Sequence, residues 1–285
     1  MTIIHNGVKQ MKYEEKKPPA ELEPYIKCFW YLNREYHESD NEEILWPDGC
    51  YEMIFHFGTK YKVQNQLMDT SFLIGSLTHY HRLTAHGNIR LFGIRLKPWG
   101  LKFWVDTDIK ELRDKFVPLD TLFKQNTIEH IESRLKDLEL EEGMTLLHKF
   151  MLNSFKQNHF VDKHFIRILT ELYEFPVQQD IQTLVSRSHY SQRQFERKVL
   201  ELTGLSPKKL SKVARFNQVR LKIFFAPETD LHDCMHEFGY YDYAHFSKDF
   251  KECIGLTPKE YKNWILEKKN QGQNKQENVV FLQDE

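Results

Sequence analysis

The sequence predicts an α+β protein with a β-rich N-terminal domain, a helical connector and an all-α C-terminal domain. Three observations lead to this fold class. Apolar residues alternate with a period of two in roughly the first 120 residues, they follow helical spacing after that, and two stretches in the last third repeat each other. With 285 residues, the chain is long enough for two domains of ordinary size.

Composition argues against several classes of protein. Hydrophobic residues make up 40% and charged residues 28% of the chain, as in ordinary globular proteins. The sequence has no apolar run of about 18 residues and no secretory signal at its N-terminus, so neither a membrane protein nor a secreted one is expected. The four cysteines include no pair at C-x-x-C spacing, so we expect free thiols and a cytoplasmic location.

Residues 18–120 carry the pattern of β-strands. In the segment 50–57, alternate side chains share one face, namely Tyr51, Met53, Phe55 and Phe57. Further strands are expected at 72–75 and 89–96, with turn signals at 47–49, 86–88 and 98–100. The charged stretch 1–17 before this domain is expected to be a flexible lead-in.

The pattern changes to helical spacing after the β-rich domain. Apolar residues then fall three or four positions apart, as at Ile128 and Ile131, and Pro176 marks a boundary. We therefore expect a helical connector over 121–176, whose apolar stripe either packs against the β-rich domain or forms a dimer surface. The polar segment 265–285 is expected to be a disordered tail.

An internal repeat occupies the last third of the chain. Residues 180–210 resemble residues 230–261 at an offset of 50 or 51 positions. The matched positions include Asp180 with Asp230, Phe195 with Phe246, and Gly-Leu-Ser-Pro at 204–207 with Gly-Leu-Thr-Pro at 255–258. Each copy predicts a short apolar helix, a tight turn and a second helix with a narrow apolar stripe, which together form a helix-turn-helix unit. Gly239 suits the left-handed backbone that the second turn needs.

The segment between the two copies predicts one long helix. Apolar residues over 207–225 keep helical spacing, so this helix would hold the two units at a fixed separation. The C-terminal domain, 177–264, is thus predicted to contain two helix-turn-helix units joined by a long helix. Two such second helices about 34 Å apart fit successive turns of a major groove on one side of DNA.

The second helix of each copy presents candidate side chains for DNA contact. Arg carries paired donors that match the two acceptors of guanine, and Gln carries a donor and an acceptor that match adenine. The candidates in the first copy are Ser191, Gln192, Arg193, Gln194, Glu196, Arg197 and Lys198. Those in the second copy are Tyr243, Ala244, His245, Ser247 and Lys248.

This arrangement resembles the C-terminal module of the AraC/XylS family of transcription regulators. The resemblance covers residues 177–262, and its most specific stretch is GYYDYAHFSKDF at 239–250, followed by GLTP at 255–258 and Tyr261. It implies that base-reading positions fall on Arg193, Glu196 and Arg197 in the first unit and on Tyr243, Ala244, His245 and Lys248 in the second. Ala244 lacks a hydrogen-bonding side chain and Tyr243 is bulky, which predicts that the second unit reads bases less, or mainly grips the backbone.

The β-rich segment resembles an uncharacterised domain that is often found ahead of AraC-type modules. This resemblance rests on residues 45–58, 73–75 and 93–100. It implies a sensory or dimerising role and provides no ligand-binding residues.

Charge is distributed unevenly over the two copies, although the whole chain has a formal net charge of only −1. Residues 181–222 hold ten Lys or Arg and two Glu, whereas residues 228–262 hold four Lys and eight acidic residues. We therefore expect the first unit and the connecting helix to neutralise most of the DNA phosphates.

Histidines and tryptophans in the β-rich domain are the other candidate site residues. His79 and His81 alternate on a predicted strand, as in a cupin-like metal site, but no carboxylate follows them within a few residues. We therefore favour solvent-facing or hydrogen-bonded histidines, and expect no metal and no cofactor. Trp30, Trp46, Trp99 and Trp104 either form ordinary cores or line an apolar ligand pocket.

Three classes of function remain to be compared. A sequence-specific DNA-binding transcription regulator is favoured, with residues 1–175 as a sensor or dimeriser. An enzyme is not expected, because no catalytic motif has supporting context. The alternative is a protein-interaction module whose acidic second unit contacts polymerase or another protein. The predicted partner is double-stranded DNA, and further candidates are a small-molecule effector, RNA polymerase and a second copy of the chain, without membrane binding.

Overall fold

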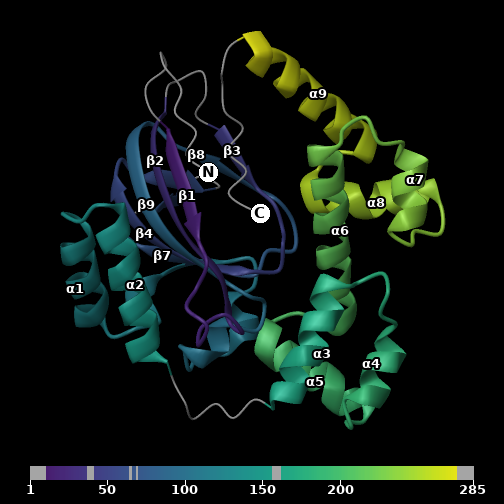
Figure 1. Ribbon diagram of the computed structural model, residues 1–285, viewed down its shortest axis with the longest axis horizontal. Coiled ribbons are helices and arrows are strands. Elements are labelled where there is room, and N and C mark those ends of the chain that lie inside the picture. Colours follow the sequence, from purple (N-terminus) through teal and green to yellow (C-terminus); the bar gives the residue numbers. More distant parts are fainter. Residues whose placement is uncertain (1–10, 37–41, 64–65, 69, 156–161, 275–285) are drawn as a thin grey trace.

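The structure is a computed structural model that describes residues 11–36, 42–63, 66–68, 70–155 and 162–274. Its N-terminal part is built on two antiparallel sheets, and helices make up the remainder, which confirms the predicted fold class (Figure 1).

The strands form one large and one small sheet. In the large sheet the order is β1 (Lys12–Lys16), β2 (Ile26–Tyr36), β9 (Gly87–Leu96), β4 (Tyr51–Gly58), β7 (Phe72–Ile74) and β10 (Phe116–Pro118). The small sheet has the order β3 (Glu42–Leu45), β8 (His81–Thr84), β5 (Tyr61–Val63) and β6 (Gln66–Met68). Trp30 and its apolar neighbours from both sheets form the core between them.

The period-two pattern in β4 correctly predicted which side chains share a face. Tyr51, Met53 and Phe55 point into the core on one side of the large sheet, and Ile54 points into the core on the other side. The strand is therefore buried on both faces, with its alternate side chains divided between two cores.

The first strand corrects the expectation of a flexible lead-in over 1–17. Residues Lys12–Lys16 form β1, which pairs with β2 in antiparallel register, with Glu14 opposite Tyr31. Its charged side chains suit an edge strand, because the outer edge of a sheet must not attract further strands. Residues 1–10 lie outside the described part of the chain.

Two helices cover the outer face of the large sheet (Figure 1). They are α1 (Gln125–Leu135) and α2 (Leu140–Ser154), and Ile128, Ile131 and Leu147 contribute to the core beneath them. The apolar stripe of this part of the connector therefore packs within the chain. The third connector helix, α3 (Lys163–Glu174), packs instead on the C-terminal helices.

Six helices described after α3 form two units around a long central helix (Figure 1). They are α4 (Ile181–Arg187), α5 (Gln192–Thr203), α6 (Pro207–Phe225), α7 (Leu231–Glu237), α8 (Tyr243–Ile254) and α9 (Pro258–Asn274). The predicted long helix is confirmed as α6, which Ser206 caps and Pro207 begins.

The last helix corrects the expected start of a disordered tail at 265. The described part of α9 continues to Asn274, and Ile265 is buried in the core of the second unit. Ile265 therefore anchors this helix to the second unit, although the polar composition of the segment suggested disorder. Residues 275–285 lie outside the described part of the chain.

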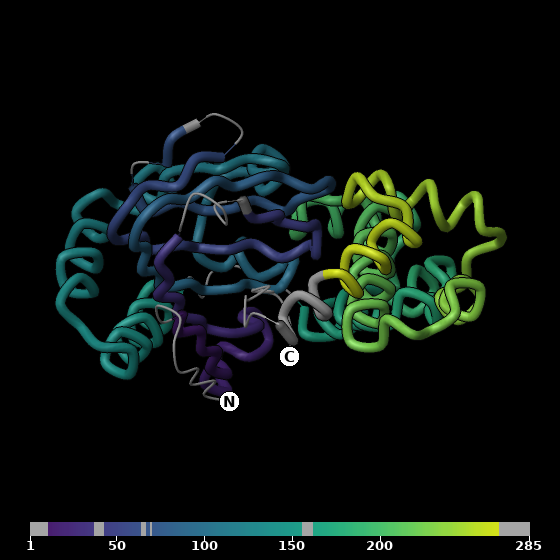
Figure 2. The backbone as a smooth tube through the Cα atoms, turned by 90° about the horizontal axis from the view of Figure 1, so that it is seen from above, coloured from purple at the N-terminus to yellow at the C-terminus, as the bar shows by residue number. Residues whose placement is uncertain are grey.

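The β-rich domain packs against both units (Figure 2). Trp99 joins the core of α3 and the first unit, and the hydroxyl of Tyr51 donates a hydrogen bond of 2.9 Å to the carbonyl of Thr203 at the end of α5. Trp46 joins the core of the second unit, with its ring 6.1 Å from that of Tyr261. The four tryptophans named as pocket candidates are thus all core residues, and Trp46 and Trp99 link the domains.

Candidate nucleic-acid interface

The second helix of each unit is called its recognition helix from here on. In the first unit this helix is α5, which is fixed at both ends and along its inner face. Ser191 caps the N-terminus in a capping box with Gln194, and Gly204 ends the helix in the left-handed conformation, with φ 69°. Phe195 and Val199 are fully buried, which holds one side of the helix on its domain. The opposite side is therefore presented to solvent as a rigid ridge.

Exposed polar side chains occupy that ridge. Gln192, Arg193, Glu196 and Arg197 are all exposed, as a DNA-reading surface requires. Glu196 accepts a hydrogen bond of 3.1 Å from Gln192, and Arg197 lies 3.6 Å from Glu201 in an exposed ion pair. These are surface contacts between flexible side chains, and they are weak enough for DNA to replace.

Two of the predicted contact residues have a structural role in the same helix. The hydroxyl of Ser191 accepts from the backbone N–H of Gln194, and the side-chain oxygen of Gln194 accepts from the backbone N–H of Ser191 at 3.0 Å. Lys198 is half-buried, and its ammonium group lies 4.8 Å from the centre of the Tyr190 ring. The most accessible cationic groups on this ridge are Arg193 and Arg197.

The second recognition helix, α8, is built in the same way. Asp242 caps it by accepting from the backbone N–H of His245 at 2.7 Å, Phe246 and Phe250 are buried, and Gly255 ends it with φ 79°. The shared caps and apolar anchors explain why the repeat could be recognised from sequence.

The exposed side of α8 differs from that of α5. Ala244, His245 and Lys248 are exposed, and Ser247 is half-buried. Tyr243 is half-buried against Phe246, with the ring centres 5.8 Å apart, and burial raises the pKa of its hydroxyl. The predicted candidates of the second unit therefore include the cationic side chain of Lys248 and two rings with packing partners, Tyr243 and His245, which lies 5.4 Å from the Tyr240 ring.

The turns before the two recognition helices adopt the same backbone with different residues. Gly239 has φ 66°, as predicted, and His189 has φ 59° at the matching position of the first unit. A non-glycine residue in this region costs about 1–2 kcal/mol. The first unit therefore tolerates strain that the second avoids.

Tyr241 is a surface residue that the sequence patterns did not single out. It lies directly before the cap of α8, and its side chain is 91% exposed. An aromatic ring left in water at the start of a recognition helix is placed to contact a groove wall. Aromatic content alone could not distinguish it from the many buried tyrosines and phenylalanines.

Basic residues of α6 are paired with acidic residues of the second unit. The ammonium group of Lys212 lies 2.8 Å from Asp249 and 2.9 Å from Glu252, and Lys209 lies 3.3 Å from Glu252. Lys222 forms an ion pair with Glu237. The positive charge counted for the connecting helix and the negative charge counted for the second unit thus partly cancel within the protein.

This pairing shifts the ionisation of both partners. Burial lowers the pKa of Lys212, but hydrogen bonds to Asp249 and Glu252 outweigh this and raise the pKa above its usual value. The hydrogen bond from Lys212 lowers the pKa of Glu252. Both groups stay charged at neutral pH, so these ion pairs hold part of the positive charge of α6 against the acids of the second unit.

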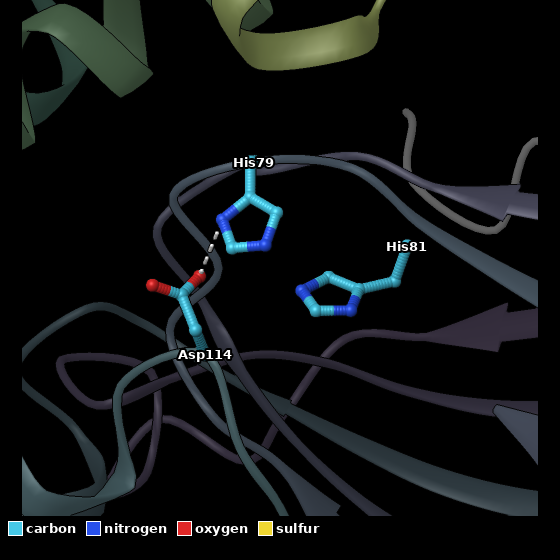
Figure 3. Close-up of side chains that lie close together, drawn as sticks. All are labelled: His79, His81 and Asp114. Carbon is cyan, nitrogen blue, oxygen red and sulfur yellow. Dashed lines mark ion pairs between the residues drawn. The ribbon is translucent and has the colours of Figure 1, made fainter. Parts of the chain in front are cut away.

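A second cluster of polar side chains lies in the β-rich domain, where it faces the C-terminal helices (Figure 3). His79, His81 and Asp114 place one potential ligand atom each within 4.8 Å of the others. The carboxylate beside the histidine pair belongs to Asp114, which lies in the segment before β10 rather than within a few residues of the pair. A fold that joins distant segments could not be anticipated from the local spacing.

Family comparisons agree with the two-part architecture. Residues 184–263 match the family described as a helix-turn-helix domain, and residues 14–118 match a domain of unknown function, DUF6597. The class of protein is therefore a DNA-binding transcription regulator. Its C-terminal domain is a helix-turn-helix domain of the AraC type, which confirms the resemblance seen in the sequence.

Solved structures include distant likenesses over most of the chain. ToxT from Vibrio cholerae is 14% identical, with 82% of this chain and 97% of that chain covered and a TM-score of 0.42. ToxT from Vibrio cholerae O395 bound to (E)-4-(8-methylnaphthalen-1-yl)but-3-enoic acid is 13% identical, with 82% and 97% covered and a TM-score of 0.44. No curated protein matches this chain. Among the described helices, none combines the length and apolarity that crossing a membrane needs.

Proposed function

We propose that this protein is a sequence-specific transcription regulator that reads bases mainly with α5 of its first helix-turn-helix unit. The observation that carries this proposal is the ridge of α5, where Arg193 and Arg197 are exposed above the buried anchors Phe195 and Val199. Guanidinium groups on a docked helix can donate paired hydrogen bonds to guanine in the major groove.

The second unit supports binding in a different way. Lys248 and the exposed Tyr241 can contact the DNA backbone and the groove wall, whereas Ala244 has no group with which to read a base edge. The second helix therefore orients the protein on the duplex and adds less sequence information.

A titration of duplex DNA at fixed salt tests the division between the units. The combined Arg193→Ala and Arg197→Ala variant should lose about 2–6 kcal/mol of binding free energy, at about 1–3 kcal/mol for each base contact. The Ala244→Ser variant, which changes the matching face of α8 without removing a contact, should bind within about twofold of the wild-type protein. Equal losses in both variants would overturn the proposal.

We further propose that the β-rich domain transmits a signal or a dimer contact to the DNA-binding units. Its Trp46 and Tyr51 contact the second and first units respectively. A change in this domain can therefore alter the placement of either recognition helix. Sedimentation of the full chain with and without a candidate effector, compared with its DNA affinity under the same conditions, would show whether dimerisation is linked to DNA affinity. A DNA affinity that changes neither with the effector nor with dimerisation would exclude this role.

A partner-protein contact through the second unit is the second candidate function. Two exposed aromatic residues favour it, Tyr241 before α8 and Phe225 at the end of α6, which are 91% and 61% exposed. Several acids of this unit already bind α6. In an in vitro transcription assay, a Phe225→Ser variant with normal duplex affinity should lose activation if polymerase binds here. Unchanged activation would remove this surface as the contact.

A further inference from the structure

We propose that His79, His81 and Asp114 form a binding site for a divalent transition-metal ion of the Zn²⁺ type, located where the β-rich domain meets the second helix-turn-helix unit. No local sequence motif joins all three residues, because Asp114 is brought beside the two histidines only by the pairing of distant segments. The site is argued from its own geometry, and only its effect on DNA binding rests on the proposed function.

The three side chains converge on one point (Figure 3). Nδ1 of His79 lies 3.5 Å from a carboxylate oxygen of Asp114, the two imidazole rings are 4.6 Å apart, and the ligand atoms all lie within 4.8 Å of one another. Zn²⁺ bonds of about 2.0–2.2 Å in a tetrahedron put neighbouring ligand atoms about 3.4 Å apart. Small side-chain rotations are enough to reach that geometry.

The surroundings hold two of the three ligands in place. The Asp114 carboxylate accepts hydrogen bonds from Thr78, at 2.6 Å from its backbone N–H and 2.8 Å from its hydroxyl. Asp114 itself adopts a left-handed backbone with φ 54°, which is uncommon for a residue other than glycine. His81 is 3% exposed, and its ring packs edge-on against Phe116. Such outer contacts are what orient the ligands in metal sites.

The donor set selects the kind of ion. Two imidazole nitrogens and one carboxylate oxygen suit Zn²⁺, Co²⁺ and Ni²⁺, whereas Mg²⁺ and Ca²⁺ require oxygen ligands throughout. Three protein ligands leave a position for water, and the His79 side chain is 49% exposed, so the ion can exchange with solvent. This is the arrangement of a reversible site.

Tyr80, which lies between the two histidines in the sequence, brings the site into contact with the second unit. A Cβ atom added to Gly255, at the end of α8, would come within 2.6 Å of the Tyr80 ring, so this ring rests directly on the glycine backbone. On the neighbouring strand, Leu45 pairs with His81 and precedes Trp46, whose ring contacts Tyr261 of α9. A metal that fixes His79 and His81 therefore also fixes two contacts that position the second recognition helix.

Titration of the purified full-length protein with Co²⁺, followed by its visible absorption and by Zn²⁺ competition, tests the site without any DNA. The wild-type protein should bind one equivalent. His79→Ala and Asp114→Asn should each weaken binding by roughly 100-fold or more, because a ligand is lost. His86→Ala, which removes an exposed histidine between β8 and β9, should bind as the wild type does. Wild-type affinity in both ligand variants, or no saturable binding in the wild type, would overturn the proposal.

Hydrogen exchange of the same samples tests the coupling. Zn²⁺ should slow amide exchange over 253–262 several-fold in the wild type and leave it unchanged in His79→Ala. Exchange that does not respond to bound Zn²⁺ would overturn the link to the second unit. Because neither readout involves DNA, failure here is distinguishable from failure of the proposed DNA-binding function.

Discussion

The two helix-turn-helix units can be compared position by position. Both second helices begin at a capping side chain, Ser191 or Asp242, and both end at a left-handed glycine. Their outward faces have diverged, because α5 presents Arg193 where the exposed start of α8 presents Ala244. The scaffold of a repeat is thus fixed by local rules, while its solvent-facing positions can specialise for different tasks.

Their charges differ as much as their side chains. Asp249 and Glu252 on α8 face the basic residues of α6, so the second unit uses its acids to dock on the connecting helix. Both units also dock through apolar contacts, with Leu184 and Phe195 buried in the first and Phe250 packed on Phe216 of α6 in the second. The first unit keeps Arg193 and Arg197 exposed. The comparison therefore favours the proposal that the first unit reads DNA and the second places the protein on it.

The largest expected effect tests what the units share. Phe195→Ala and Phe246→Ala each remove a fully buried ring and should lower the unfolding free energy by about 3–5 kcal/mol. Denaturant melts of the full chain measure this. A loss below 1 kcal/mol in one of them would show that the two scaffolds are not equivalent.

The turns offer a sharper contrast between the units. Gly239→Ala should destabilise the protein by about 1–2 kcal/mol, because alanine disfavours φ 66° and its Cβ would lie 3.3 Å from Val177. His189→Gly should be close to neutral, because relief of backbone strain is offset by the entropy of the unfolded chain. Thermal melts that rank the two variants the other way would contradict this account of the turns.

Removing one acid of the second unit should free basic residues of α6 to bind DNA phosphates, and so make the second unit more like the first in its DNA binding. Glu252→Gln frees Lys209 and Lys212 from one partner and should raise affinity for any duplex several-fold at low salt, with a steeper salt dependence. Stability should change by no more than about 1 kcal/mol, since these pairs are partly exposed. The Glu267→Gln variant, at an exposed position of α9, serves as the charge-matched control. Equal gains in both would attribute the effect to net charge alone.

The smallest expected effect concerns Tyr241. Tyr241→Ala should weaken DNA binding by roughly threefold to tenfold, about 1 kcal/mol, as expected for one exposed contact, and should leave the melting temperature unchanged. Binding titrations paired with melts separate these two effects. A large loss of stability with no change in affinity would make Tyr241 a structural residue.

Local signals carried most of the information about the C-terminal domain. Helix caps, the Gly-Leu-[Ser/Thr]-Pro stretches and apolar residues four positions apart all act within a few residues, so α5, α6 and α8 could be placed from the sequence. The pairing of Lys212 with Asp249 joins helices that are far apart in the chain, and no local pattern reports it. For this reason a count of charges along the sequence does not show which cations already have acidic partners.

Long-range pairing explains the other differences. Residues Lys12–Lys16 form a strand because β2 offers them an edge, whereas their charged side chains alone suggested a loose segment. Asp114 joins His79 and His81 because β10 pairs with β7, which brings a segment more than 30 residues away beside them. Tertiary pairing of this kind determines both the edge strand β1 and the cluster of His79, His81 and Asp114.

The division of labour between the units is tested most directly by single-base substitutions in a duplex selected from random sequences by the full-length protein. Each substitution of a read base pair should cost about 1–3 kcal/mol. We predict that these costly positions cluster in the half of the site bound by α5, and that substitutions one helical turn away, beneath α8, cost much less. Equal costs in both halves would contradict the account.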